Sequence, residues 1–331
     1  MAVADVLASA VELVMGKATG VAAPSSGPST PRGSGTHPCA RNSCTPPPRT
    51  CSGSGTRRSP PCQTGGVTGG WQEADDASEV ALTGGTMTVG VVRVGDTVRR
   101  PVGRWTPAVH SLLRYLEEVG FEGAPRVLGI DEKGREVLTY LPGDPSPSHS
   151  DATLVATARL VRRLHDALAG FTPSPDAVWR HPPLGRRAPS PHIGHNDLCA
   201  VNTICVDGVP YGFIDWDMAG PGGPLDDLAL AAAQYTPIRP DRFWPRPGWP
   251  WPIDRPARLR MFCDAYGVED RIGFLDAIEV FLQESLKETV ELGRQRISPY
   301  GRFLDGHEDV MRRLELEWLA QNREALERAL R

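Results

Sequence analysis

The fold is decided by one stretch of the chain, Ile193-Gly194-His195-Asn196-Asp197-Leu198-Cys199-Ala200-Val201-Asn202, which is followed by Gly212-Phe213-Ile214-Asp215-Trp216-Asp217. Its polar residues His195, Asp197 and Asn202 lie between apolar segments, which is typical of a short loop. Thirteen residues after Asn202, an apolar run ends in the carboxylate of Asp215. We therefore predict a loop that carries reactive polar side chains and then a strand that ends in a carboxylate.

The spacing His-x-Asp-x-x-x-x-Asn matches that of a kinase catalytic loop, in which the Asp positions the attacking hydroxyl and the Asn holds a magnesium ion. Together with Ile214-Asp215-Trp216, it resembles the motif of the aminoglycoside phosphotransferases and their choline-kinase-like relatives. The run Asp215-Trp216-Asp217 stands in place of Asp-Phe-Gly, and no Ala-Pro-Glu occurs, which favours a small-molecule kinase over a protein kinase. The chain has no Gly-x-x-x-x-Gly-Lys-Ser/Thr motif, which excludes a P-loop NTPase.

The resemblance implies an α+β, two-lobed protein-kinase-like fold over residues 79–331. A small N-terminal lobe, residues 79–142, would contain an antiparallel β-sheet and one helix and would bind the nucleotide. A large, mainly helical C-terminal lobe, residues 143–331, would carry the catalytic residues and bind the acceptor.

The resemblance also implies ATP- and Mg²⁺-dependent transfer of a phosphoryl group to a hydroxyl of a small molecule, such as an aminoglycoside-like antibiotic or a related metabolite. Asp197 would be the catalytic base, and Asn202 and Asp215 would supply oxygen ligands to Mg²⁺. His195 belongs to the same catalytic loop, where a hydrogen bond to the backbone near Asp215 is favoured over an acid–base role. The alternative is a catalytically idle nucleotide-binding module with an immunity or regulatory role. Arg99 and a missing partner acid in the nucleotide-binding part motivate it, and some bacterial relatives resemble, more loosely, a peptide-antibiotic immunity protein.

The predicted small lobe begins with two β-rich runs around a Gly84-Gly85 turn, followed by a third strand that ends at Pro101. By itself, Gly-Gly between such runs indicates only a hairpin. By resemblance, Gly84 and Gly85 would cover the nucleotide phosphates, and a cation on the third strand would pair with them. That cation is predicted to be Arg99, with Arg100 as the rival. Arginine offers a planar fork where kinases usually have the point charge of lysine.

The next helix is predicted to start at Thr106-Pro107, a good N-cap followed by a first-turn proline. By resemblance, a carboxylate in its first turns would pair with the strand cation. His110 stands there, and no acidic residue does. We therefore predict that the ion pair that positions the nucleotide lacks its usual acid.

Two further strands are predicted at 124–130 and 135–141, around a turn at 131–134. The second strand runs into Pro142-Gly143, which resembles the hinge after which the larger lobe of a kinase begins. By resemblance, backbone groups near Thr139 and Leu141 would hydrogen-bond the adenine.

Three residues around the motif are assigned supporting roles. His165 ends a predicted amphipathic helix over 151–169 and is interpreted as a structural histidine beneath the catalytic loop, in preference to a base. Asp217 has two interpretations, an outer ligand of the metal site or a hydrogen-bond acceptor for the loop backbone. Asp227 is interpreted as a helix cap that supports the loop.

The helical remainder is expected to shape the acceptor pocket. A proline-stiffened loop at 243–252 contains three tryptophans, which either pack on the helices or hold a sugar or a quaternary amine. Four glutamates give the helix predicted over 272–292 an acidic side, which is either a solvated face or a surface for a cationic acceptor. They are Glu279, Glu284, Glu288 and Glu291. The identity of the acceptor and the oligomeric state stay open.

The chain of 331 residues has a formal net charge of −4, which gives no reason to expect a nucleic-acid partner. No apolar run approaches the ~20 residues of a membrane span. The first sixteen residues lack the basic start of a signal peptide. The seven cysteines include no Cys-x-x-Cys pair, so neither a zinc site nor a disulfide framework is supported. We expect a cytoplasmic protein without a membrane partner.

Residues 1–78 are expected to be a low-complexity, disordered extension. From Val21 to Gly70, 33 of the 50 residues are Pro, Gly, Ser or Thr, and none is acidic. Such a segment buries too little apolar surface to offset the entropy of ordering it. A dispensable extension, or a start codon assigned too early, is favoured over a basic arm that binds a partner.

Overall fold

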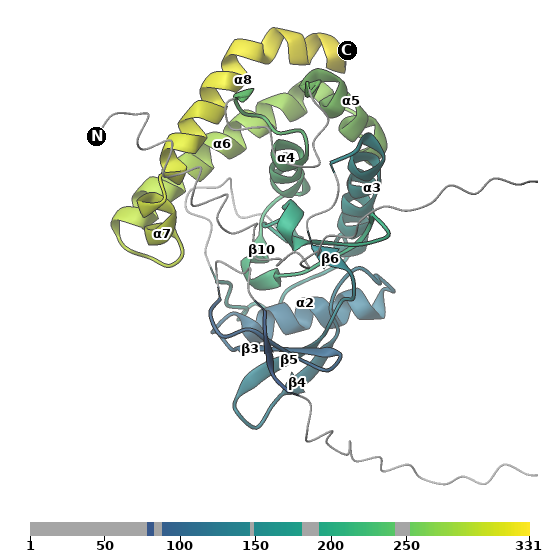
Figure 1. Ribbon diagram of the computed structural model, residues 1–331, viewed down its shortest axis with the longest axis vertical. Helices are drawn as coiled ribbons and strands as arrows, with labels where there is room; N and C mark the ends of the chain where they lie inside the picture. Colours follow the sequence, from purple (N-terminus) through teal and green to yellow (C-terminus); the bar gives the residue numbers. More distant parts are fainter. Residues whose placement is uncertain (1–77, 83–87, 146–148, 181–191, 242–251) are drawn as a thin grey trace, which may run out of the picture. The chain divides into compact units, whose positions relative to one another are not determined.

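The computed structural model describes residues 78–82, 88–145, 149–180, 192–241 and 252–331 (Figure 1). The extension predicted over residues 1–78 lies outside the described residues, apart from Ser78. Gly84, Gly85 and residues 243–251 of the tryptophan-rich loop also lie outside them. The described residues belong to one compact unit.

Short β-rich runs form an antiparallel sheet in the N-terminal part of this unit. Five strands lie in the order β1-β2-β3-β5-β4, and every neighbouring pair is antiparallel. The strands are β1 Val80–Ala81, β2 Val92–Val94, β3 Thr97–Pro101, β4 Val127–Ile130 and β5 Arg135–Thr139. Gly95 and Asp96 join β2 to β3, and the φ of 58° at Gly95 is one that glycine adopts without a Cβ clash.

One helix, α2 (Thr106–Glu118), packs beside this sheet in contact with β4 (Figure 1). Leu112, Leu113 and Leu116 recur at helical spacing and are fully buried. The helix starts at Thr106 as predicted, but Trp105 occupies the N-cap position. The Thr106 hydroxyl instead accepts a hydrogen bond from the backbone N–H of Gly103 at 2.9 Å. The Thr106 hydroxyl therefore fixes the turn before the helix and does not cap the helix.

The C-terminal part is mainly helical. Its helices are α3 Asp151–Leu168, α4 Pro224–Tyr235, α5 Arg255–Tyr266, α6 Arg271–Arg294, α7 Tyr300–Asp305 and α8 Glu308–Leu330. The long helix α6 contacts α4, α7 and α8, while α3 packs on α5 (Figure 1). An antiparallel sheet with one helix thus precedes a mainly helical part, which confirms the predicted α+β class.

Two small sheets carry the catalytic segment. One has the strand order β6-β8-β9, and the other pairs β7 with β10. Their bounds are β6 Asp144–Pro145, β7 Ile193–Gly194, β8 Thr203–Val206, β9 Val209–Phe213 and β10 Gly220–Pro221. The predicted loop lies between β7 and β8, and Asp215 follows the end of β9 by two residues. The loop and the Asp215 segment therefore each follow a strand that is paired in one of these two sheets.

A single hydrophobic cluster joins the sheet to the helices. It includes Leu116 of α2, Leu138 of β5, Leu164 of α3, Phe213 of β9 and Leu228 of α4. Burying one such side chain contributes about 1.5–3 kcal/mol to folding. Because β9 ends within this cluster, the position of the segment that follows it is fixed by the core.

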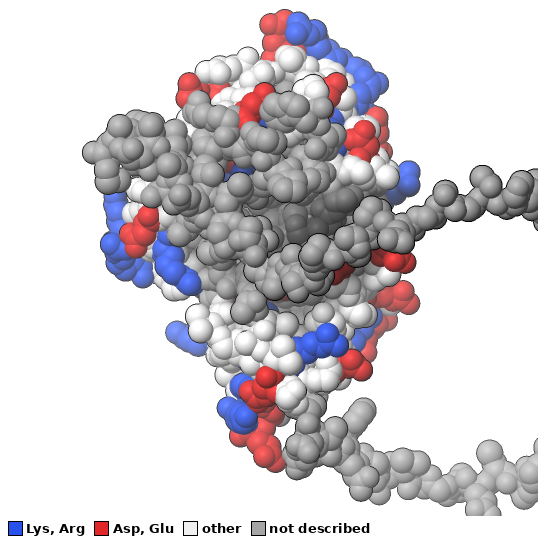
Figure 2. All heavy atoms as spheres, viewed as in Figure 1, with Lys and Arg blue, Asp and Glu red and all other residues white. Residues whose placement is uncertain are grey.

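Basic and acidic side chains lie interspersed over the face drawn in Figure 2. None of the described helices combines the length and the apolar composition that crossing a bilayer requires.

Candidate active site

A buried carboxylate of α4 holds the start of the catalytic loop. Asp227 accepts hydrogen bonds from the backbone N–H groups of His195 and Asn196, both at 2.8 Å. His165 lies 3.4 Å from Asp227 and also contacts the Tyr266 hydroxyl at 2.9 Å. This agrees with the structural role predicted for His165. Asp227 also supports the loop, but it does not cap α4: the N-cap is Gly223, whose N–H donates to the carboxylate of Asp226 in the first turn.

These contacts keep Asp227 ionised. Burial by itself raises the pKa of Asp227, but the side-chain contact of His165 and the backbone N–H of His195 outweigh burial and lower it. A carboxylate that accepts backbone N–H groups is favoured in its charged form. The loop is therefore anchored on a fixed negative charge, 1% exposed.

Asn196 ties the catalytic loop to the segment after Asp215. Its φ is 60°, a left-handed conformation that asparagine tolerates better than most residues. Its side-chain amide donates to the carbonyl oxygens of Met218 at 3.1 Å and Gly220 at 3.2 Å. The pairing of Gly194 with Gly220 lies directly beside these bonds. The loop and the Asp215 segment therefore behave as one rigid piece.

His195 connects the same two segments through hydrogen bonds of its ring nitrogens. Its Nδ1 accepts the backbone N–H of Asp197 at 3.3 Å, so its Nε2 donates to the carbonyl of Ile214 at 3.1 Å. The ring is fully buried, 4.5 Å from the ring of Trp216. Burial lowers the pKa of His195, which keeps the ring neutral. Both ring nitrogens therefore hydrogen-bond to backbone groups. The bond to Ile214 is the contact near Asp215 that the sequence predicted.

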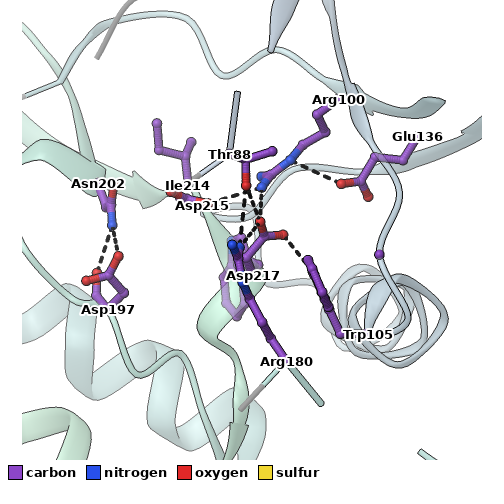
Figure 3. Close-up of polar contacts among 12 residues, drawn as sticks. Thr88, Arg100, Trp105, Glu136, Arg180, Asp197, Asn202, Ile214, Asp215 and Asp217 are labelled. Carbon is purple, nitrogen blue, oxygen red and sulfur yellow. Dashed lines mark hydrogen bonds and ion pairs between the residues drawn. The ribbon is translucent and has the colours of Figure 1, made fainter. Parts of the chain in front are cut away.

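Asp197 and Asn202 face each other across the loop (Figure 3). The amide nitrogen of Asn202 donates to the Asp197 carboxylate at 2.7 Å and to its carbonyl at 3.0 Å. Burial, and next the negative charge of Asp215, raise the pKa of Asp197 to about 7. A carboxylate with this pKa is tuned to exchange a proton near neutral pH.

Asp215 is held in an unusual backbone conformation. Its φ and ψ are 62° and 64°, in the left-handed region that costs a non-glycine residue about 1–3 kcal/mol. The surroundings impose this conformation, since the N–H of Ile214 donates to the carbonyl of Asn202 at 2.9 Å. The Asp215 side chain is 21% exposed and accepts a bond from Arg100 at 3.2 Å. Strain of this kind is typical of a residue whose side-chain direction matters.

Arg100, and not Arg99, reaches the catalytic segment. Successive side chains of a strand point to opposite faces, so only one of the two can face Asp215. Arg100 is 7% exposed, and its guanidinium lies 3.2 Å from Asp215 and 2.5 Å from Asp217. Arg99 is half-buried on the other face of β3. The rival residue therefore has the geometry that the sequence expected of Arg99.

The acid that pairs with this cation comes from a strand. Glu136 of β5 lies opposite Arg100 in the sheet register, 3.1 Å from its Nε. His110 of α2 contacts the other oxygen of Glu136 at 2.8 Å. Burial lowers the pKa of Arg100, but the charges of Asp217, Asp215 and Glu136 outweigh burial and raise it. In the sequence, Glu136 is one of two adjacent charged residues, Arg135 and Glu136, at the start of β5, and no motif marks it as the partner of Arg100.

Asp217 gathers side chains from four segments, which we call the Asp217 cluster (Figure 3). Besides Arg100, it accepts bonds from Thr88 Oγ1 at 2.7 Å, Trp105 Nε1 at 3.1 Å and Arg180 Nη1 at 2.7 Å. Neither sequence interpretation of Asp217 anticipated these partners. The members are 37 to 129 residues from Asp217 in the chain, so no local pattern could have identified them.

The donor set fits magnesium if phosphate or water completes it. An amide oxygen of Asn202 and a carboxylate of Asp215 are the hard ligands that Mg²⁺ prefers. Among the described residues, no group of three or more His, Cys, Asp or Glu side chains forms a metal site by itself. The repulsion that Asp215 exerts on Asp197 is one that a divalent cation would offset. Asp217 is less suited, because two arginines already neutralise it.

The predicted hinge residues follow the end of β5. The N–H of Thr139 donates to the carbonyl of Arg126 at 2.9 Å, and that of Tyr140 donates to Asp96. These two N–H groups are therefore engaged within the sheet. Leu141 is half-buried next to Gly212, where a Cβ would approach its side chain to 3.1 Å. Its part in binding adenine stays a prediction.

The acidic side of α6 is largely used within the fold. Glu279 accepts a bond from Arg323 of α8 at 2.8 Å, and Glu284 lies 3.8 Å from Lys287. Glu288 is buried, and Glu291 is exposed. The contact with α8 favours a structural role for this side over a surface that receives a cationic acceptor.

Comparison with known proteins places the chain in a family. Residues 173–273 match the phosphotransferase enzyme family, APH. The chain is 34% identical over 262 residues to the trifolitoxin immunity protein of Rhizobium leguminosarum bv. trifolii, and the match covers 76% of this chain and 98% of that protein.

Solved structures resemble this one at low sequence identity. The amicoumacin kinase in complex with AMP-PNP, Ca²⁺ and Ami has a TM-score of 0.50 and 12% identity, covering 75% of this chain and 89% of that one. The GDP complex of aminoglycoside 2'-phosphotransferase-IIIa has a TM-score of 0.49 and 16% identity, covering 75% and 95%. The likeness to the amicoumacin kinase agrees with the kinase-like fold predicted from the motif.

Proposed function

The chain belongs to the phosphotransferase enzyme family, and from this we propose that it transfers the γ-phosphoryl group of ATP, with Mg²⁺, to a hydroxyl of a small molecule. One observation carries the proposal. Asp197 and Asn202 lie in hydrogen-bond contact, and His195 ties their loop to the segment of Asp215. A base and two hard metal ligands on one rigid support are what phosphoryl transfer asks of a protein.

Asp197 serves as the base in this reaction. It accepts a hydrogen bond from the acceptor hydroxyl and takes its proton as the new O–P bond forms. The bond between the γ-phosphorus and the bridging oxygen breaks, and ADP leaves with that electron pair. Burial raises the pKa of Asp197, which makes its carboxylate a stronger base for this proton.

Asn202 and Asp215 hold the metal. When bound, Mg²⁺ neutralises the negative charge on the phosphate oxygens. The backbone of Asp215, fixed in the left-handed region, sets the direction of its carboxylate. Arg100, braced by Glu136, supplies the strand cation that pairs with the phosphates. His195 positions the loop and takes no proton.

The test is ATP consumption by the full chain with a panel of hydroxylated acceptors, aminoglycosides first. Relatives named for aminoglycosides and amicoumacin motivate this order. Asp197→Ala should abolish turnover without lowering the melting temperature. Asp176→Ala, an exposed carboxylate outside the site, is the control and should keep full activity. Unchanged turnover in Asp197→Ala would sink the assignment of the base.

A second candidate function is nucleotide binding without turnover, in an immunity role. The match to 98% of an immunity protein at 34% identity favours it. Calorimetry with ATP and Mg²⁺ separates the two. Metal-dependent binding with no consumption across the acceptor panel supports the second candidate, while consumption with any acceptor supports the first.

A further inference from the structure

Arg180 is a buried cation that no motif of the sequence includes. It lies in the segment between α3 and β7, and its side chain is 8% exposed. Its Nη1 lies 2.7 Å from Asp217 Oδ2 and 3.4 Å from Thr88 Oγ1. Its guanidinium carbon lies 4.6 Å from the centre of the Trp105 ring. The Arg180 guanidinium thus contacts the carboxylate of Asp217, the hydroxyl of Thr88 and the ring of Trp105.

Its location is the place where the strand lobe meets the metal-binding segment (Figure 3). Thr88 precedes β2, and Asp217 follows the proposed metal ligand Asp215 by two residues. Arg100 shares the same carboxylate oxygen of Asp217. Arg180 and Arg100 therefore converge next to the proposed metal ligand from two separate segments of the chain.

Among the described side chains of this group, the carboxylates outnumber the arginines. Two arginines, Arg100 and Arg180, face three carboxylates, which are Glu136, Asp215 and Asp217. One negative charge is in excess, and a divalent cation at Asp215 would turn this into one positive charge in excess. Buried charge is costly unless it is compensated. An anionic ligand beside the two arginines supplies that compensation.

We propose that Arg180 is a second phosphate-binding residue of the site and contacts the phosphates of the bound nucleotide, while Asp217 positions it. The inference rests on the proposed function. A guanidinium presents five N–H donors in a planar fork, so it can hold Asp217 and a phosphate oxygen at once. The Trp105 ring, 4.6 Å from the guanidinium carbon, is placed for a cation–π contact that holds the fork in position, and a held fork matches the oxygens of a phosphate.

The test compares the affinities of the full chain for ATP with Mg²⁺ and for adenosine, by calorimetry. Arg180→Ala should lower the affinity for ATP at least about tenfold, the loss of a charged hydrogen bond, and leave the affinity for adenosine unchanged. Arg180→Lys keeps the charge without the fork and should recover part of the loss. Arg162→Ala is the matched control, because it breaks an exposed Arg–Asp pair of α3 and should change neither affinity.

Two results would overturn the inference. An equal fall in the affinities for ATP and adenosine would show that Arg180 only supports packing, and an unchanged ATP affinity would show that it makes no contact. Should the alanine variant fail to fold, Arg180→Gln keeps most of the side chain over Trp105 and carries the same expectation. Wild-type protein that binds no ATP would refute the proposed function as well. Wild-type turnover with an unaffected Arg180 variant would refute this inference alone.

Discussion

The catalytic loop and the Asp217 cluster adjoin each other, and different forces hold them. The loop is held by hydrogen bonds to backbone groups. Asp227 accepts two N–H groups of the loop, and the side chains of His195 and Asn196 donate to carbonyl groups of the Asp215 segment. The Asp217 cluster is held by ion pairs between side chains. Backbone hydrogen bonds fix a shape whatever ligand is present, whereas a group of charges changes its balance when a cation or an anion enters. We infer that the loop is rigid and that the cluster responds to the nucleotide.

Removal of the loop's anchor should have the largest effect on stability. Asp227→Ala leaves two buried N–H groups and His165 without their acceptor, so the free energy of unfolding should fall by about 4 kcal/mol. Urea unfolding measures it. Asp226→Ala is the matched control, since it removes the acceptor of the Gly223 N–H at the start of α4 and should cost about 1 kcal/mol. Equal losses in the two variants would contradict the distinction between these two roles.

The two arginines of β3 should differ more than any other pair of neighbours. Arg100→Ala leaves three carboxylates, of which Glu136 and Asp217 are buried, with one cation fewer, which should cost about 3 kcal/mol in stability and raise the KM for ATP. Arg99→Ala, on the other face, should change stability by less than about 0.5 kcal/mol. Thermal unfolding and ATP-dependent kinetics check both. A larger effect of Arg99→Ala would show that Arg99, the residue that the sequence favoured, is the strand cation.

Acid should weaken the loop's anchor. The pKa of Asp227 is lowered in the folded state, so the unfolded state binds its proton more readily. Its stabilisation is fully present above the unfolded pKa of about 3.9 and is lost as the pH falls through the lower folded value. Urea unfolding from pH 6 downward should therefore show a stability that falls on the acid side. Asp227→Asn should flatten that slope, and an unchanged slope would contradict the ionised anchor.

The smallest effect is expected at the edge of the Asp217 cluster. Trp105→Phe removes the N–H that Asp217 accepts at 3.1 Å but keeps an aromatic ring beneath Arg180. One neutral donor to a charged acceptor that keeps three other partners should be worth about 1 kcal/mol. Thermal unfolding and the affinity for ATP measure it. A loss as large as that of Arg100→Ala would show that the indole, and not the ion pairs, holds the cluster.

Much of this architecture could be predicted from local patterns. Leu112, Leu113 and Leu116 recur at helical spacing and are buried, and the motif residues lie on the loop where the spacing placed them. The supporting part of His165 also followed from its position at a helix end. The choice between Arg99 and Arg100 could not be made, because it depends on which face of β3 turns toward Asp215.

The amino-acid sequence by itself determined the kinase-like fold and the spacing that brings Asp197, Asn202 and Asp215 onto one support. Those features depend on periodicity and on contacts within a few residues. Only the tertiary structure decided the partners of the arginines, Glu136 for Arg100 and Asp217 for both Arg100 and Arg180. The physical reason is that an arginine pairs with the acidic side chain that the packed core brings close to it. The separations of 37 residues between Arg180 and Asp217 and of 115 residues between Arg100 and Asp215 leave no trace of such pairings in the sequence.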